Sequence, residues 1–107
     1  MHILDAARAF LELAQTPLAR IETVNYIVLG PRPFPTAEEL VQTVKAKIPD
    51  ARLDFKVNKK VSELIETVTA RPFDDRCARQ EWDWQHQSSV EDMVNDFMAH
   101  AHREVAA

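Results

Sequence analysis

Apolar residues recur every three or four positions along most of this chain, which is the period of an amphipathic helix. The first such stripe runs from Leu4 to Gln15, and Asp5 lies in its first turn, where negative charge is favoured. A second stripe follows Thr36-Ala37-Glu38-Glu39, which has the spacing of a capping box, and it ends at Ile48 before Pro49. The chain therefore begins with two predicted helices separated by about twenty residues.

Three further helices are expected in the second half of the chain. One covers residues 59–66, and a loop over 67–73 follows it. Asp74 or Asp75 can cap a short helix that reaches Glu81 or Trp82. The last helix opens at Ser88-Ser89-Val90-Glu91, a second capping box, and has a wide apolar face.

Two segments have the character of strands. Val24 to Leu29 is rich in β-branched and aromatic residues, and Gly30 and Pro31 end it. Ala51 to Val57 alternates apolar with charged residues, which is typical of a half-exposed edge strand.

These elements predict an α/β fold, or α+β when isolated, in one helix-rich lobe over residues 1–107 with about two strands and five helices. Two strands make a poor sheet, so a missing part of the chain or a partner should supply the rest. Self-association through the apolar faces left exposed is the other expectation. The first helix also begins with no evident capping residue, which favours a chain that continues upstream of Met1.

Composition and charge exclude several classes of function. Gly30 is the only glycine, so neither a G-x-G-x-x-G nor a G-x-x-x-x-G-K-[ST] phosphate loop exists in these residues. A net charge of −4 argues against nucleic-acid binding. The chain has no apolar run long enough for a membrane span, no secretory signal, and one cysteine, Cys77, so a cytoplasmic setting without a membrane partner is expected.

Few residues suggest catalysis. His86, His100 and His102 lack the spacing of metal ligands, so no metal site is expected. Cys77 lies near a predicted helix start but beside acids, which favours plain packing over a nucleophile. Asp74 and Asp75 suit helix capping better than acid–base work.

Two other features are candidates for contact or packing. Trp82 and Trp84 are better explained as core anchors than as a stacking platform for a ligand. Arg71, beside Pro72, can hold a carboxylate or phosphate with two hydrogen bonds, or can pair with Asp74 or Asp75.

The segment Phe73-Asp74-Asp75-Arg76-Cys77-Ala78-Arg79-Gln80-Glu81-Trp82-Asp83-Trp84 resembles the C-terminal part of extended short-chain dehydrogenase/reductases, the NAD-dependent epimerase/dehydratase superfamily. It is most similar to L-threonine 3-dehydrogenase-like members, whose pattern is approximately I-D-D-S-x-A-R-x-D-W-G-W. The start, Met1 to Ala9, is similar to the family's h-x-x-x-D-A-x-R-A segment. Asp83 replaces the usual glycine, which we expect to remove a positive-φ conformation there.

The resemblance implies a substrate-binding lobe without the Rossmann half, hence with no cofactor-binding or catalytic residue in this chain. NAD would be the cofactor of the complete enzyme, and the substrate would be a small molecule, an amino acid or a nucleotide-sugar. Thr69 stands where the threonine dehydrogenases carry a pocket tryptophan, and Arg71-Pro72 is loosely similar to a phosphate-contacting R-P, so Thr69 and Arg71 are the expected substrate contacts. The alternative function is a stand-alone binding or oligomerisation module without catalysis.

Overall fold

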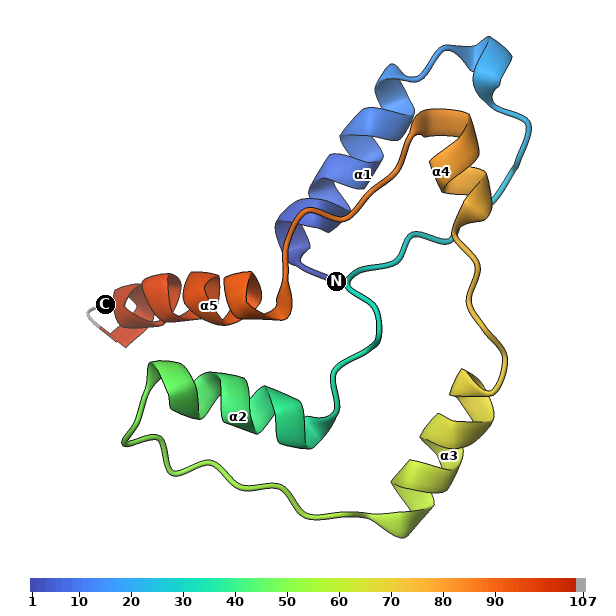
Figure 1. The fold of residues 1–107 in the computed structure, drawn as a ribbon. Helices are drawn as coiled ribbons and strands as arrows, with labels where there is room; N and C mark the ends of the chain where they lie inside the picture. The colour runs from blue at the N-terminus through green and yellow to red at the C-terminus, as the bar shows by residue number, and fades with distance from the viewer. Residues whose placement is uncertain (106–107) are drawn as a thin grey trace.

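A buried core lies between helix α1 (Ile3–Gln15) and helix α4 (Arg76–Trp82) in the computed structural model, which describes the backbone of residues 1–105 and the side chains of residues 1–101 (Figure 1). Ala9 of α1 and Ala78 of α4 are buried in one cluster with Trp82 and Trp84. Trp84 is 1% exposed. Both tryptophans are therefore core anchors, as expected from the sequence.

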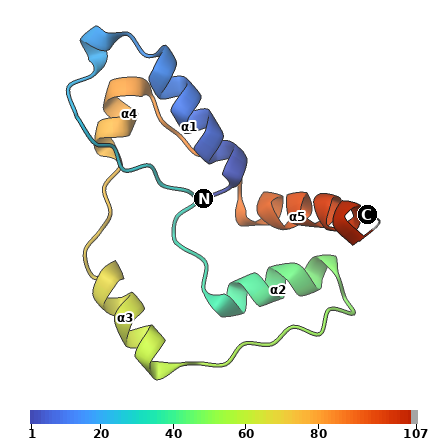
Figure 2. The ribbon, with the colours of Figure 1, turned by 180° about the vertical axis from the view of Figure 1, so that it is seen from behind.

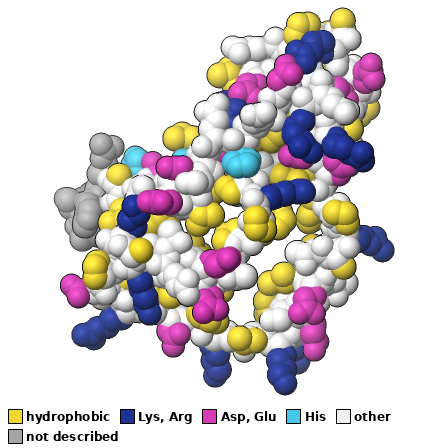
Figure 3. All heavy atoms as spheres, viewed as in Figure 1, with side chains coloured by type: hydrophobic (Ala, Val, Ile, Leu, Met, Phe, Trp, Pro, Cys, Tyr) yellow, Lys and Arg dark blue, Asp and Glu magenta, His cyan; other side chains and the backbone are white. Residues whose placement is uncertain are grey.

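The remaining helices spread away from this core. A 3₁₀ turn, η1 (Leu18–Arg20), follows α1, and then come α2 (Ala37–Lys47), α3 (Lys59–Thr69) and α5 (Val90–Val105). Helices α2 and α5 pack side by side, and an ion pair joins Lys47 to Glu91 (Figures 1 and 2). Helix α3 stands apart, and the space-filling view shows a hollow between it and α2 (Figure 3).

This arrangement is unusually open. The Cα radius of gyration is 17.3 Å, against about 13 Å for a compact chain of 100 residues. The accessible surface is 8869 Å², whereas a folded monomer of this mass exposes roughly 6,100 Å². Large apolar side chains such as Phe10, Val24 and Phe97 lie on that surface. The chain thus leaves apolar area uncovered that a compact domain would bury.

The predicted α/β class is wrong for the described residues. Residues 1–105 form helices and loops, with no strand and no sheet. The two predicted strands, Val24–Leu29 and Ala51–Val57, are irregular instead. A strand is defined by hydrogen bonds to a neighbour, and neither segment has such a neighbour among these residues.

Helix ends follow the predicted chemistry at α2 and, with a shift, at α5. At α4 the N-cap residue is Asp75, but its side chain makes no capping hydrogen bond, and the amide of Arg76 donates to Asp74 instead. The capping box of α2 is present, with Thr36 and Glu39 as partners. At α5 the reciprocal pair is Ser89 and Asp92, one position after the predicted pair. Helix α3 continues to Thr69, so the predicted loop over 67–73 starts later than expected.

The expectation of an uncapped first helix is also wrong. The ring nitrogen Nδ1 of His2 accepts a hydrogen bond of 3.1 Å from the amide of Leu4. Histidine is not among the common N-cap residues, so little in the sequence indicates this contact.

Two backbone positions have special requirements. Asp83 ends α4 with φ 60° and ψ 30°, so the aspartate adopts the left-handed conformation that we expected the loss of glycine to prevent. Aspartate tolerates this region better than most residues. Gly30 is needed for space, because a Cβ there would lie 2.9 Å from the Cα of Met1.

Candidate functional site

Two loops that are distant in sequence meet beside the end of α3. Arg32, in the proline-rich loop 30–35, donates a hydrogen bond to the backbone carbonyl of Phe73. Its guanidinium carbon also lies 5.8 Å from the ring centre of Phe34. The prolines of this loop fix φ at three positions, which helps to hold Arg32 against the segment that follows α3.

A cavity of about 240 Å³ opens at this junction, and it contains both residues predicted to contact substrate. Two arginines, two prolines, two phenylalanines and a threonine line it: Arg32, Pro33, Phe34, Thr69, Arg71, Pro72 and Phe73. The structure thus brings Thr69 and Arg71 to one cavity. It adds Arg32, which the sequence did not single out because the contact spans 41 positions.

The polar groups of this cavity differ in the hydrogen-bond donors and acceptors that remain available to a ligand. The hydroxyl of Thr69 donates to the carbonyl of Ile65 at 2.8 Å, so its oxygen lone pairs remain as acceptors. Arg71 is exposed, and it also lines a second cavity of about 610 Å³. A guanidinium in this position has donors for an oxyanion, framed by apolar walls.

The alternative pairing of Arg71 with the neighbouring acids does not occur among the described side chains. Asp74 pairs with Arg76 at 2.6 Å, and Asp75 pairs with Arg79 at 3.0 Å. Hydrogen bonds from the backbone and side chain of Arg76 lower the pKa of Asp74. The two carboxylates are therefore engaged with other arginines, which leaves Arg71 unpaired and gives the acids a structural role.

Glu81 fastens the segment before the proline loop to α4. Its carboxylate accepts from the amides of Glu22 at 2.8 Å and Thr23 at 3.0 Å, and from the hydroxyls of Thr23 and Tyr26. The hydroxyl bonds from Thr23 and Tyr26 are the main cause that lowers the pKa of Glu81 to about 2. Burial, followed by the bond to Glu81, raises the pKa of Tyr26. Nothing in the sequence pattern marked Glu81, because its partners lie 55 to 59 positions away.

Asp5 likewise anchors the segment between α4 and α5 to α1 by accepting hydrogen bonds from backbone amides. Its buried carboxylate accepts from the amides of Gln87 at 3.1 Å and Ser88 at 3.0 Å. It also accepts from Arg8 at 2.9 Å, and Arg8 lies 4.8 Å above the Trp84 ring centre. Burial pushes the pKa of Asp5 upward, but the hydrogen bonds from Arg8, Ser88 and Gln87 outweigh it and lower the pKa.

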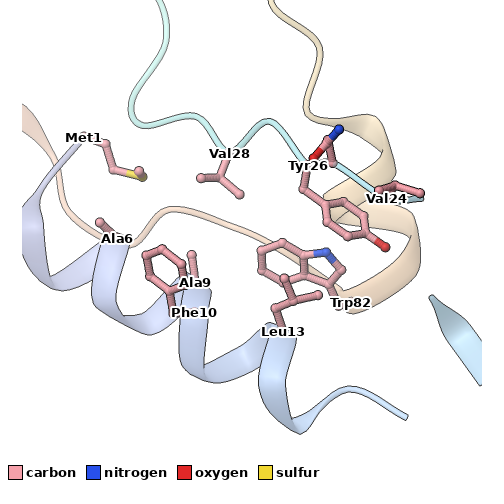
Figure 4. A pocket seen from close by; sticks show the side chains of 10 residues that line it. Met1, Ala6, Ala9, Phe10, Leu13, Val24, Tyr26, Val28 and Trp82 are labelled. Carbon is pink, nitrogen blue, oxygen red and sulfur yellow. The ribbon is translucent and has the colours of Figure 1, made fainter. Parts of the chain in front are cut away.

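An apolar cavity of about 250 Å³ lies between α1 and the loop that Glu81 holds (Figure 4). Phe10 and Leu13 of α1 lie on one side of it, and Tyr26 and Val28 lie on the other. The rings of Tyr26 and Trp82 meet edge to face with centroids 5.7 Å apart. This cavity has few polar groups, so it suits packing better than recognition of a charged molecule.

The remaining candidates are dispersed. His86 is exposed, and Nδ1 of His100 lies 2.8 Å from the carbonyl of Asp96. The side chain of His102 lies outside the described residues. In the part of the chain that the structure describes, no three His, Cys, Asp or Glu side chains gather as metal ligands would. Cys77, for which plain packing was favoured over a nucleophile, is exposed.

Similar proteins point to one enzyme family. No family profile matches the chain. It is 30% identical over 98 residues to the mitochondrial L-threonine 3-dehydrogenase of Bos taurus and 31% identical to that of Sus scrofa. Each match covers 92% of this chain but 26% of the relative, so the chain spans about a quarter of the length of these enzymes.

The fold is similar as well. The X-ray structure of L-threonine dehydrogenase from Clostridium difficile superimposes on 97% of this chain and 32% of that one, with a TM-score of 0.74 and 20% identity. The resemblance to L-threonine 3-dehydrogenases expected from the sequence is confirmed, and it fits the C-terminal part of such an enzyme. No helix formed by residues 1–105 has the length and apolar character needed to cross a membrane.

Proposed function

We propose that this chain, similar to one part of the L-threonine 3-dehydrogenases, is the substrate-binding portion of a dehydrogenase- or epimerase-like oxidoreductase. Thr69 and Arg71 contact the substrate. NAD and the catalytic residues belong to a Rossmann half outside these 107 residues, and the chain alone has no oxidoreductase activity. The protein works in the cytoplasm.

The position of Arg71 is the observation that carries this proposal. It lines two cavities, is exposed, and forms no ion pair with the described acids, although Asp74 lies three positions away. An arginine kept out of its local ion pairs has its bidentate donors available for a ligand carboxylate or phosphate. The oxygen of Thr69 can accept a hydrogen bond from the same ligand.

The lining also limits the substrate class. Phe34 and Phe73 with two prolines supply apolar walls, and Arg32 adds a second positive charge. A small molecule with a carboxylate or phosphate group and a polar donor fits this chemistry. Both an amino acid and a nucleotide-sugar meet that description.

Calorimetric titration tests the proposal. We expect L-threonine or UDP-glucose to bind the chain, and Arg71→Ala to abolish the heat. Arg76→Ala is the matched control, because Arg76 is an exposed arginine on the same segment that already pairs with Asp74. NAD should give no tight binding. Tight NAD binding, or substrate binding that survives Arg71→Ala, contradicts the proposal.

The second candidate function is a self-associating module without catalysis. The excess surface of roughly 2,800 Å² over a compact monomer favours it, because stable interfaces bury about 800 Å² per partner, which this excess surpasses. Light scattering separates the two candidates: a monodisperse dimer that binds neither small molecule supports the module.

A further inference from the structure

The larger of the two cavities at Arg71 has apolar walls from three parts of the chain. Its volume is about 610 Å³, within the range of roughly 300–1,000 Å³ for small-molecule sites. Ile27 from the segment after η1, Val68 from α3 and Phe73 from the loop after α3 line it. Each of these side chains is between 42% and 49% exposed. A ligand with an apolar body would therefore remove much of this uncovered area from water.

The other polar residues of that cavity are already engaged. Asp74 accepts from the backbone amide of Arg76 at 2.9 Å and from its guanidinium at 2.6 Å, which balances the charge of the carboxylate. The hydroxyl of Thr67 donates to the carbonyl of Glu63 at 2.8 Å, inside α3. Arg71 forms no ion pair with any acid whose side chain the structure describes. Arg71 is thus the group of this cavity with charged donors left for a ligand.

A single free guanidinium selects the charge of the ligand. Its parallel N–H groups match the two oxygens of one carboxylate. Arg32, the other arginine of this region, lines the smaller cavity and not the larger one. One positive charge among apolar walls therefore favours a monoanion with a hydrocarbon body over a multiply charged phosphate ester.

We propose that the 610 Å³ cavity binds a medium-chain aliphatic carboxylate, with the carboxylate on Arg71 and the hydrocarbon chain against the apolar walls. The inference rests on the proposed function in taking Arg71 as the anion contact. It assigns a ligand to a different cavity, because Thr69 does not line this one.

Calorimetric titration with butanoate, hexanoate and octanoate measures the contribution of the hydrocarbon chain. Each methylene buried in the cavity should tighten binding about fourfold, so octanoate should bind roughly 200-fold more tightly than butanoate. Octan-1-ol has the same chain without the charge. It should bind at least about tenfold more weakly than octanoate, because it cannot form charge-assisted hydrogen bonds with Arg71. Arg71→Gln should weaken octanoate binding by a similar factor.

A pair of substitutions on α3 tests the location. Val68→Asp puts a negative charge into the apolar wall and should weaken octanoate binding at least about tenfold. Val61→Asp is the matched control, because Val61 is 48% exposed against 49% for Val68 and lies outside this cavity. Circular dichroism of both variants should match that of the unchanged chain, since each valine is half-exposed.

The outcomes separate this inference from the proposed substrate site. Val68→Asp should leave the L-threonine and UDP-glucose titrations unchanged, because Val68 does not line the 240 Å³ cavity. Octanoate binding without binding of either of those molecules contradicts the substrate site and supports the inference. Affinities that do not rise with chain length, that are equal for octanoate and octan-1-ol, or that survive Val68→Asp overturn the inference, whether or not those two molecules bind.

Discussion

Replacing Asp5 by Asn should destabilise the protein substantially although the two side chains have nearly the same shape. The Asp5 carboxylate is 2% exposed and accepts hydrogen bonds from Gln87, Ser88 and Arg8. An amide keeps one acceptor oxygen and turns an NH₂ group toward at least one of these donors. A buried donor left without a partner costs about 1–3 kcal/mol.

We therefore expect Asp5→Asn to lower the free energy of unfolding by about 2 kcal/mol. For a chain of this size that change lowers Tm by roughly 8 to 16 °C. Thermal and urea unfolding followed by circular dichroism measure both quantities. Glu63→Gln, an exposed carboxylate-to-amide change on α3, should stay within about 0.5 kcal/mol of the unchanged protein.

The effect should depend on pH with a definite sign. Because the folded-state pKa of Asp5 is lowered, its stabilising contribution is complete above the unfolded value of about 3.9 and is lost as pH falls through the folded pKa. The difference between the unchanged protein and Asp5→Asn should therefore be large at pH 7 and shrink below about pH 4. A difference under about 0.5 kcal/mol at pH 7, or one that stays constant to pH 3, would refute the reasoning.

Three further sets of substitutions test other contacts. Glu81→Gln should speed amide hydrogen exchange at Thr23, because the amide group cannot accept all the bonds of the carboxylate. Because the folded-state pKa of Glu81 is about 2, its carboxylate should stabilise this loop fully above the unfolded value of about 4.3 and lose that contribution progressively as pH falls toward 2. Asp83→Gly should be neutral or stabilise by up to about 1 kcal/mol, and Asp83→Val should destabilise by about 1–2 kcal/mol in urea unfolding, because residue 83 has positive φ. Ser89→Ala should cost about 1 kcal/mol in the same assay by removing the α5 cap, whereas Ser88→Ala should cost less.

Local signals in the sequence predicted the helices well. The capping box at Thr36 and Glu39 and the apolar stripes depend on residues three or four positions apart, and such contacts form wherever the segment is placed. The one-position shift at Ser89 arises because the amide of Ser88 bonds to Asp5, more than eighty positions away. A pattern of neighbouring residues cannot show that Asp5 and Glu91 compete for the amide of Ser88.

The prediction of two strands was wrong because strand formation depends on a neighbouring segment and not on local pattern alone. Residues 51–57 have strand-like alternation, but a strand needs a neighbour, and the described residues supply none. Of the residues that line the candidate cavity, the sequence singled out two. Thr69 and Arg71 are close in sequence and were found together, whereas Arg32 reaches the same cavity through a contact across the fold. Asp5 and Glu81 were missed as loop anchors for the same reason.

Chemical-shift mapping of the ¹⁵N-labelled chain tests the proposed function most directly. UDP-glucose or L-threonine should shift amides near Arg32 and between Thr69 and Phe73, and Arg71→Ala should remove the shifts. NAD should leave the spectrum unchanged. Shifts caused by NAD, or substrate shifts confined to the apolar cavity beside α1, would contradict a substrate site at Arg71.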